Sequence, residues 1–124
     1  MIKGIILTDI FIDCKEPERL LEFYYELTGW EKTKKYNSSA LKTKEGLTIL
    51  FKECDVPHEP PVWPEEIGKQ QKQMHLDFAV NDLQRAVSEA VNLGAKIAKE
   101  QFGGSHWVTL LDPEGHPFCF GVDE

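Results

Sequence analysis

Two residues of the stretch MHLDFAV, His75 and Asp77, have the side chains best suited to chemistry in this chain. Because successive side chains of a β-strand point to opposite faces, residues two apart lie on the same face. Leu76, Phe78 and Val80 are then expected to face a hydrophobic core, and the polar pair is expected to line a pocket. A carboxylate beside an imidazole favours the protonated ring and fixes its tautomer, so the pair could act as general acid and base. It could equally hydrogen-bond a polar ligand, or the two could bind only each other in a solvated cleft.

The residues that follow this strand predict an amphipathic helix. Asp82 can cap the helix at its start, and Gly94 can end it. Between them, apolar residues recur with the spacing of one helix face: Leu83, Ala86, Val87, Ala90 and Val91. A helix packed on the apolar side of the strand leaves His75 and Asp77 on the side that the helix does not cover.

The chain contains two copies of this unit. A shift of 66 residues aligns DIFIDCKEPERLLEFYYELTG with HLDFAVNDLQRAVSEAVNLG, so that Asp9 corresponds to His75. In the first copy Pro17 stands at the first helical position and Gly29 closes the helix. Three strands are predicted after each helix, at about 31–36, 39–43 and 47–53, and at about 96–99, 106–111 and 117–121. Each half therefore has the order β-α-β-β-β.

The length of 124 residues fits a single domain. Within it we expect two modules, 1–54 and 73–124, joined by a Pro-rich linker, 55–72. Four prolines keep this linker irregular: Pro57, Pro60, Pro61 and Pro64. Trp63 is expected to anchor it on the body of the protein.

The composition excludes several classes of partner. A net charge of −7 argues against a nucleic-acid or anionic-membrane partner, and the run Lys32, Lys34 and Lys35 is expected to be a solvated strand edge. The apolar run Ile5-Ile6-Leu7 is too short for a signal peptide or a membrane span. Three cysteines without CxxC spacing indicate reduced thiols, so a cytoplasmic location is expected.

The stretches MHLDFAVNDLQRAVSEAVNLGA and WVTLLDPEGHPFCF, in a tandem βαβββ chain, resemble the vicinal oxygen chelate superfamily and its glyoxalase-like branch. That superfamily includes glyoxalase I, bleomycin-resistance proteins and extradiol dioxygenases. The resemblance implies an α+β fold in which both modules form a cupped, incompletely closed mixed β-barrel with the helices outside. It implies a ligand held in the cup, and a homodimer.

Combined with strand alternation, the resemblance predicts the residues that line the cup. His75, Asp9 and Asp77 are the candidate acid and base residues. The candidate ligand-binding residues are Phe11, Asp13, Ile49, Phe51, Trp107, Thr109 and Cys119. His106 is expected to point away from the cup, and Ile10, Ile12 and Cys14 to pack under the first helix.

The resemblance also places four metal-ligand positions, on Asp9, Ile49, His75 and Cys119. Metalloenzymes of the superfamily usually have His or Gln, Glu, His and Glu there. Ile49 offers no ligand atom, and Cys119 occupies the cysteine of the DPEG-x-x-F-C signature, where it is expected to be a small buried hydrophobe. We therefore expect no resident metal and no other cofactor.

Three functions remain open from the sequence. The first is a glyoxalase-like protein that binds a small organic molecule without the usual metal. The second is a glyoxalase-related lyase or isomerase that uses His75 with Asp9 or Asp77 as acid and base. The third is a metal-dependent glyoxalase or dioxygenase with a degenerate ligand set. The fold does not choose among them, because it hosts unrelated chemistries.

Overall fold

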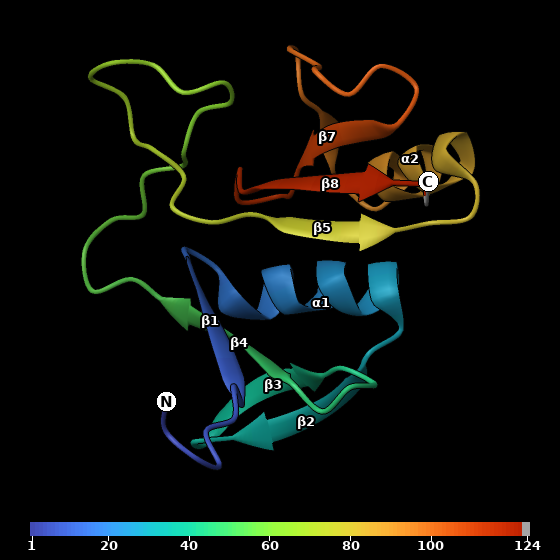
Figure 1. Ribbon diagram of the computed structural model, residues 1–124. Helices are drawn as coiled ribbons and strands as arrows, with labels where there is room; N and C mark the ends of the chain where they lie inside the picture. Colours follow the sequence, from blue (N-terminus) through green and yellow to red (C-terminus); the bar gives the residue numbers. More distant parts are fainter. Residues whose placement is uncertain (123–124) are drawn as a thin grey trace. The chain divides into compact units, whose positions relative to one another are not determined.

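The computed structural model describes residues 1–122 and divides the chain into two compact units, one from Met1 to His58 and one from Glu59 onward (Figure 1). The first unit contains β1 (Asp9–Cys14), α1 (Pro17–Thr28), β2 (Glu31–Lys35), β3 (Ser38–Lys42) and β4 (Thr48–Glu53). The second contains β5 (Leu76–Ala79), α2 (Leu83–Asn92), β6 (Lys96–Ile97), β7 (Trp107–Leu111) and β8 (Pro117–Gly121). The predicted β-α-β-β-β order is confirmed in both units.

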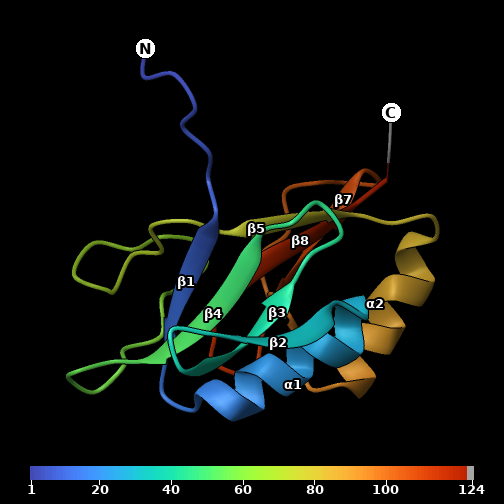
Figure 2. The ribbon, with the colours of Figure 1, turned by 90° about the horizontal axis from the view of Figure 1, so that it is seen from below.

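The two units also share their sheet topology. The strand order is β1-β4-β3-β2 in the first sheet and β5-β8-β7-β6 in the second. In each, the strand before the helix pairs in parallel with the last strand, and the remaining pairs are antiparallel. Figure 2 shows the first of these four-stranded sheets with α1 beside it. The protein is therefore an α+β chain of two open, mixed sheets, whereas the cup remains a prediction.

Both helices begin and end where the sequence predicts. Pro17 occupies the first turn of α1, and Gly29 ends the helix in the left-handed region at φ 71°, donating its N–H to the Tyr25 carbonyl. The Asp82 side chain caps α2 by accepting the Arg85 N–H at 3.1 Å. Among the described residues, no helix is both long enough and apolar enough to cross a membrane.

The faces of the second sheet follow the predicted alternation. Phe118 pairs with Leu76 and with Leu110, and both Phe118 and Leu110 are fully buried on the face that packs against α2. Cys119, one residue further, pairs with Asp77 on the opposite face. The side of β5 with Asp77 is thus turned away from the helix.

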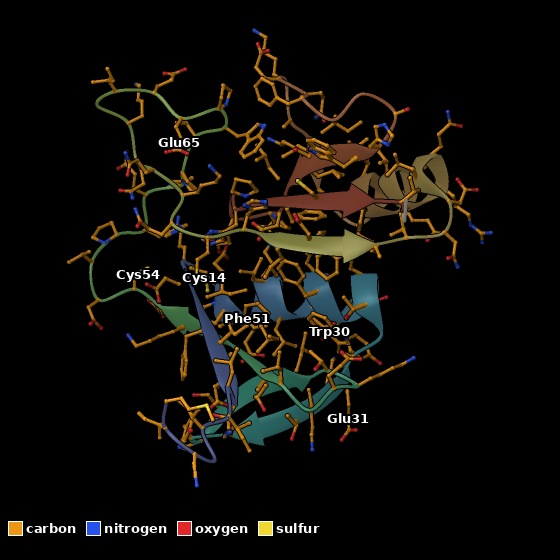
Figure 3. All side chains as sticks on the ribbon, in the orientation of Figure 1. Cys14, Trp30, Glu31, Phe51, Cys54 and Glu65 are labelled. Atoms are coloured by element: carbon orange, nitrogen blue, oxygen red, sulfur yellow. The ribbon has the colours of Figure 1, made fainter. Side chains whose placement is uncertain are left out.

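The faces of the first sheet correct one prediction. Ile49 pairs with Ile10, and Phe51 pairs with Ile12, so both lie on the same face of the sheet as those residues. Phe51 stacks on Tyr24 of α1 with ring centroids 5.8 Å apart, and Figure 3 shows its side chain beside that helix. The expectation that Ile49 and Phe51 face away from the helix is wrong. Their direction is set by the register of β4 against β1, and a shift of one residue reverses the face.

The other face of the first sheet presents different residues of β4. Leu50 pairs with Phe11, just as Cys119 pairs with Asp77 in the second unit. The residue of β4 that corresponds to Cys119 is therefore Leu50. Like Ile49, it has no atom that could bind a metal.

Candidate functional site

The second unit forms a cavity of about 520 Å³ that is open to solvent. Its walls come from β5, β7, β8 and the segment before β5. The side chains with chemical or aromatic character in these walls are Trp63, His75, Asp77, His106, Trp107 and Cys119. The cavity thus combines flat aromatic surface with two imidazoles, a carboxylate and a thiol, a composition typical of small-molecule sites.

The polar pair of β5 lies in this cavity. The His75 Nε2 atom is 3.2 Å from the Asp77 carboxylate, at hydrogen-bond distance. The His75 and Asp77 side chains are 34% and 72% exposed, so the pair is solvated and the Asp77 carboxylate is accessible to a ligand. The two-residue spacing alone predicts this arrangement, because it places both side chains on one face.

Cys119 forms the floor of the cavity behind Asp77. Its Sγ atom lies 3.3 Å from the Thr109 hydroxyl. Burial raises the pKa of the Cys119 thiol above its ordinary value of 9.0; the Thr109 hydrogen bond opposes this, and the negative charge of Asp77 adds to it. A thiol with a raised pKa is protonated at neutral pH, so Cys119 is a poor nucleophile in this state.

Trp63 is a wall of the cavity that the sequence did not predict. Its indole N–H donates to the Glu100 carbonyl at 3.1 Å, and its ring meets the His75 imidazole edge-on with centroids 6.1 Å apart. The Lys72 ammonium lies 4.8 Å from the ring centroid. The sequence identified Trp63 as an anchor of the Pro-rich segment. A tryptophan isolated among prolines was the only signal in the sequence that this segment contributes to a site.

The prediction for His106 is also wrong. The residue was expected to point away from the cup, but it lines the cavity. The prediction treated His106 as the first residue of a strand, opposite in direction to Trp107. In the structure it belongs to the turn before β7 and donates its N–H to the Gly103 carbonyl at 2.9 Å. Strand alternation does not apply to a turn, so the two neighbours can both face the cavity.

The first unit holds Asp9 in a separate polar cluster. One Asp9 oxygen accepts from the Lys35 ammonium at 2.6 Å, and the other accepts from the Tyr36 hydroxyl at 2.9 Å and the Thr8 hydroxyl at 3.0 Å. The Lys35 hydrogen bond is the main reason that the pKa of Asp9 lies below its ordinary 3.8. A carboxylate held by three donors is a weak base, which counts against Asp9 as a proton acceptor.

Of the other candidates in the first unit, Phe11 adjoins this cluster through Tyr36. Phe11 stacks on Tyr36 with ring centroids 6.3 Å apart, and Asp13 is exposed. The sequence predicted Lys35 as part of a solvated strand edge and gave Tyr36 no role. Both approach Asp9 because of the chain reversal after β2, where Tyr36 and Asn37 have positive φ.

An Asp9→Asn variant is expected to show a weaker loss of stability in acid than the wild type. The folded-state pKa of Asp9 is lowered, so its contribution is complete above pH 3.8 and disappears as the pH falls through the folded-state value. Urea unfolding at one pH above 3.8 and one well below it measures the effect. The difference in the free energy of unfolding between the wild type and Asp9→Asn should become smaller in acid. An unchanged difference would show that Lys35 and Tyr36 do not stabilise the Asp9 carboxylate.

Comparison with known proteins identifies the family. The model of the glyoxalase-like domain matches residues 9–121, which is nearly the whole chain. This chain belongs to the glyoxalase-like domain family. Among curated protein sequences, none matches it.

Solved structures of the same fold are similar to this glyoxalase-like chain at low sequence identity. A glyoxalase/bleomycin resistance protein/dioxygenase family enzyme from Burkholderia phytofirmans is 18% identical, with a TM-score of 0.69 over 95% of this chain and 98% of that one. The fosfomycin resistance protein FosX from Listeria monocytogenes is 17% identical, with a TM-score of 0.69 over 100% and 94% of the two chains. A glyoxalase-related enzyme from Fulvimarina pelagi is 13% identical, with a TM-score of 0.67 over 98% and 89%.

The ligand set of the superfamily's metalloenzymes does not fit this glyoxalase-like chain. Both oxygens of Asp9 already accept hydrogen bonds within the first unit. Ile49 packs toward α1, and Leu50, which takes the place corresponding to Cys119, has no donor atom. Asp9 and Ile49, two of the four expected positions, thus offer no suitable ligand. Of the four residues, only His75 is of the type that the metalloenzymes usually have there.

Proposed function

We propose that this glyoxalase-like protein binds a small organic molecule in the cavity of its second unit, without the four-ligand metal set of the superfamily's metalloenzymes. The observation that supports this most directly is the cavity itself. It has a volume of about 520 Å³ and is lined by the His75–Asp77 pair together with Trp63 and Trp107. Cavities of this size accommodate drug-sized molecules.

The chemistry of the walls favours a flat ligand with hydrogen-bond donors. Trp63 and Trp107 offer aromatic faces or edges for stacking, and the exposed Asp77 oxygen accepts a hydrogen bond or an ion pair. An aromatic amine or amidinium satisfies both features. Similarity of fold to FosX, named a fosfomycin resistance protein, is compatible with a role in binding a foreign small molecule.

A second candidate function is acid-base catalysis by His75 and Asp77, as in a lyase or isomerase. The 3.2 Å contact between Nε2 and the carboxylate supports it, because that contact orients the imidazole inside the cavity. The two functions differ in one observable. A binding protein leaves its ligand unchanged, whereas an enzyme converts it, so each ligand that is found should be incubated with the protein and analysed for products.

The test of the proposed function is a thermal-shift screen of aromatic amines, amidines and neutral aromatic compounds against chelator-treated protein. A compound that binds the native state at free concentration L stabilises it by RT ln(1 + L/Kd), so the unfolding temperature rises as its concentration exceeds Kd. Binding in this cavity should also change the fluorescence of Trp63 or Trp107. The proposal fails if compounds of all three classes leave both the unfolding temperature and the fluorescence unchanged.

His75→Ala is expected to weaken the binding of the best screened compound at least tenfold. The imidazole is partly exposed, and its polar contact is with the solvent-exposed Asp77 carboxylate, so the stability should change by no more than about 1 kcal/mol. His58→Ala, which changes a histidine outside the cavity, is the matched control. A large loss of stability in His75→Ala would instead identify His75 as a structural residue.

A further inference from the structure

We propose that the second unit contains a zinc-type metal site of its own, formed by His75, Asp77 and Cys119. One ligand atom from each of these residues lies within 4.8 Å of the other two. Asp77 does not occupy a metal-ligand position of the superfamily. The site shares His75 and Cys119 with the four-position set, but it takes its third ligand from Asp77 and uses residues of a single unit.

The backbone of one sheet brings the three residues together. Asp77 lies in β5 and pairs in register with Cys119 of β8, and His75 immediately precedes β5, two residues before Asp77. In a parallel pair, residues in register have side chains on the same face. The approach of Asp77 and Cys119 therefore follows from strand pairing, and His75 joins them from the residue directly before the strand.

The distances fit a small ion after modest side-chain rotation. Ligand atoms about 2.0–2.3 Å from a tetrahedral Zn²⁺ lie roughly 3.3–3.8 Å from one another. The Nε2 atom of His75 and the Asp77 oxygen are already 3.2 Å apart. No two of the three ligand atoms are more than 4.8 Å apart, and rotation of the partly exposed His75 and exposed Asp77 side chains can bring them to that tetrahedral spacing.

The donor types select the metal. Imidazole nitrogen, carboxylate oxygen and thiolate sulfur are the three ligand kinds that Zn²⁺ accepts, whereas Mg²⁺ and Ca²⁺ prefer oxygen alone. On binding, the Cys119 thiol loses its proton to solvent and forms the metal–sulfur bond. The thiolate and the Asp77 carboxylate then neutralise the two positive charges of the ion. Three protein ligands leave a fourth position, open to the cavity, for water or a ligand.

The residues behind the sulfur are suited to support it. The Thr109 hydroxyl lies 3.3 Å from Sγ and can donate a hydrogen bond to the thiolate. Gln101 fixes the Thr109 backbone by accepting its N–H at 2.9 Å and donating to its carbonyl at 2.8 Å. The edge of Trp63 also restricts the rotation of the His75 ring. Such outer contacts orient metal ligands.

Cobalt titration of the chelator-treated full chain under reducing conditions tests the site. Co²⁺ is the probe because it takes the place of Zn²⁺ and absorbs light according to its ligands. We expect saturation at one equivalent, a thiolate-to-cobalt charge-transfer band in the near ultraviolet, and loss of the band when Zn²⁺ is added. A wild-type protein without that band would overturn the proposal.

Three variants assign the ligands. Cys119→Ser should abolish the charge-transfer band, whereas Cys54→Ser, which changes a cysteine outside the cavity, should retain it. Asp77→Asn should weaken Co²⁺ binding at least tenfold. A band that persists in Cys119→Ser contradicts the proposal. If Cys119→Ser does not fold, Asp77→Asn and His75→Ala decide, and unchanged affinity in both contradicts it. No organic ligand is used, so the result is independent of the ligand screen.

Discussion

Phe51→Ala is expected to lower the free energy of unfolding by about 3–5 kcal/mol, the range for truncating a buried aromatic residue. Phe51 is only 5% exposed, and its ring stacks on Tyr24 of α1 at a centroid distance of 5.8 Å. Removing it leaves a cavity between β4 and the helix and ends the stacking contact. Urea denaturation monitored by circular dichroism gives the change in free energy.

Phe11→Ala is the matched control, because Phe11 is on the other face of the same sheet and is 51% exposed. Its truncation should change the free energy of unfolding by no more than about 1 kcal/mol. The comparison tests the face assignment directly. If Phe11→Ala cost as much as Phe51→Ala, the packing of β4 against α1 described above would be incorrect.

The misplacement of Ile49 and Phe51 has a physical reason in the composition of β4. Four consecutive residues of this strand, Thr48 to Phe51, are buried, so polar and apolar side chains do not alternate along it. In β5 the alternation of Leu76, Asp77 and Phe78 is clear, and the sequence indicated the correct face. A strand buried on both faces can be oriented only by its register with a neighbour, which is a tertiary property.

The helices could be predicted because their limits are encoded locally. Pro17, Gly29 and Asp82 act on the turn in which they occur, and the structure confirms each. The β-α-β-β-β order of elements along each half could be predicted from the repeat together with the family resemblance. The lengths of the strands were less accurate, as β6 ends at Ile97 instead of near residue 99.

The cavity was predicted only in part. The sequence indicated His75 and Asp77, which depend on one strand, and Cys119 and Trp107, which depend on the resemblance. It missed Trp63, which reaches the cavity from the irregular segment before β5, and His106, which reaches it from a turn. Neither segment has a periodic pattern, so contacts across many residues determine where those side chains lie. The same holds for Lys35 beside Asp9, 26 residues away along the chain.

A Gly103→Ala variant is expected to lose about 3 kcal/mol of stability, at the upper end of the usual range for overpacking. Gly103 is buried in the loop before β7. A methyl group there would lie 2.3 Å from the Trp107 carbonyl oxygen and 2.5 Å from Cδ2 of its ring. Backbone cannot move aside as a flexible side chain does, so the loop or the start of β7 must shift.

Gly104→Ala separates this steric effect from the general cost of replacing a loop glycine. No heavy atom lies within 4 Å of the position that a Gly104 Cβ would take, but φ is +58°. The expected cost is therefore about 1 kcal/mol, from backbone conformation alone. Equal losses in the two variants would mean that Gly103 is not packed against Trp107.

The Gly103→Ala variant should also alter the cavity, because the residue that the new methyl group meets is one of its walls. Below its unfolding temperature the variant should show changed Trp107 fluorescence and should bind the best screened compound at least tenfold more weakly, while Gly104→Ala binds it normally. Isothermal titration at a temperature where both variants are folded makes the comparison. If Gly103→Ala binds normally despite its lower stability, Trp107 does not contact the ligand, and the aromatic surface of the site must come from Trp63.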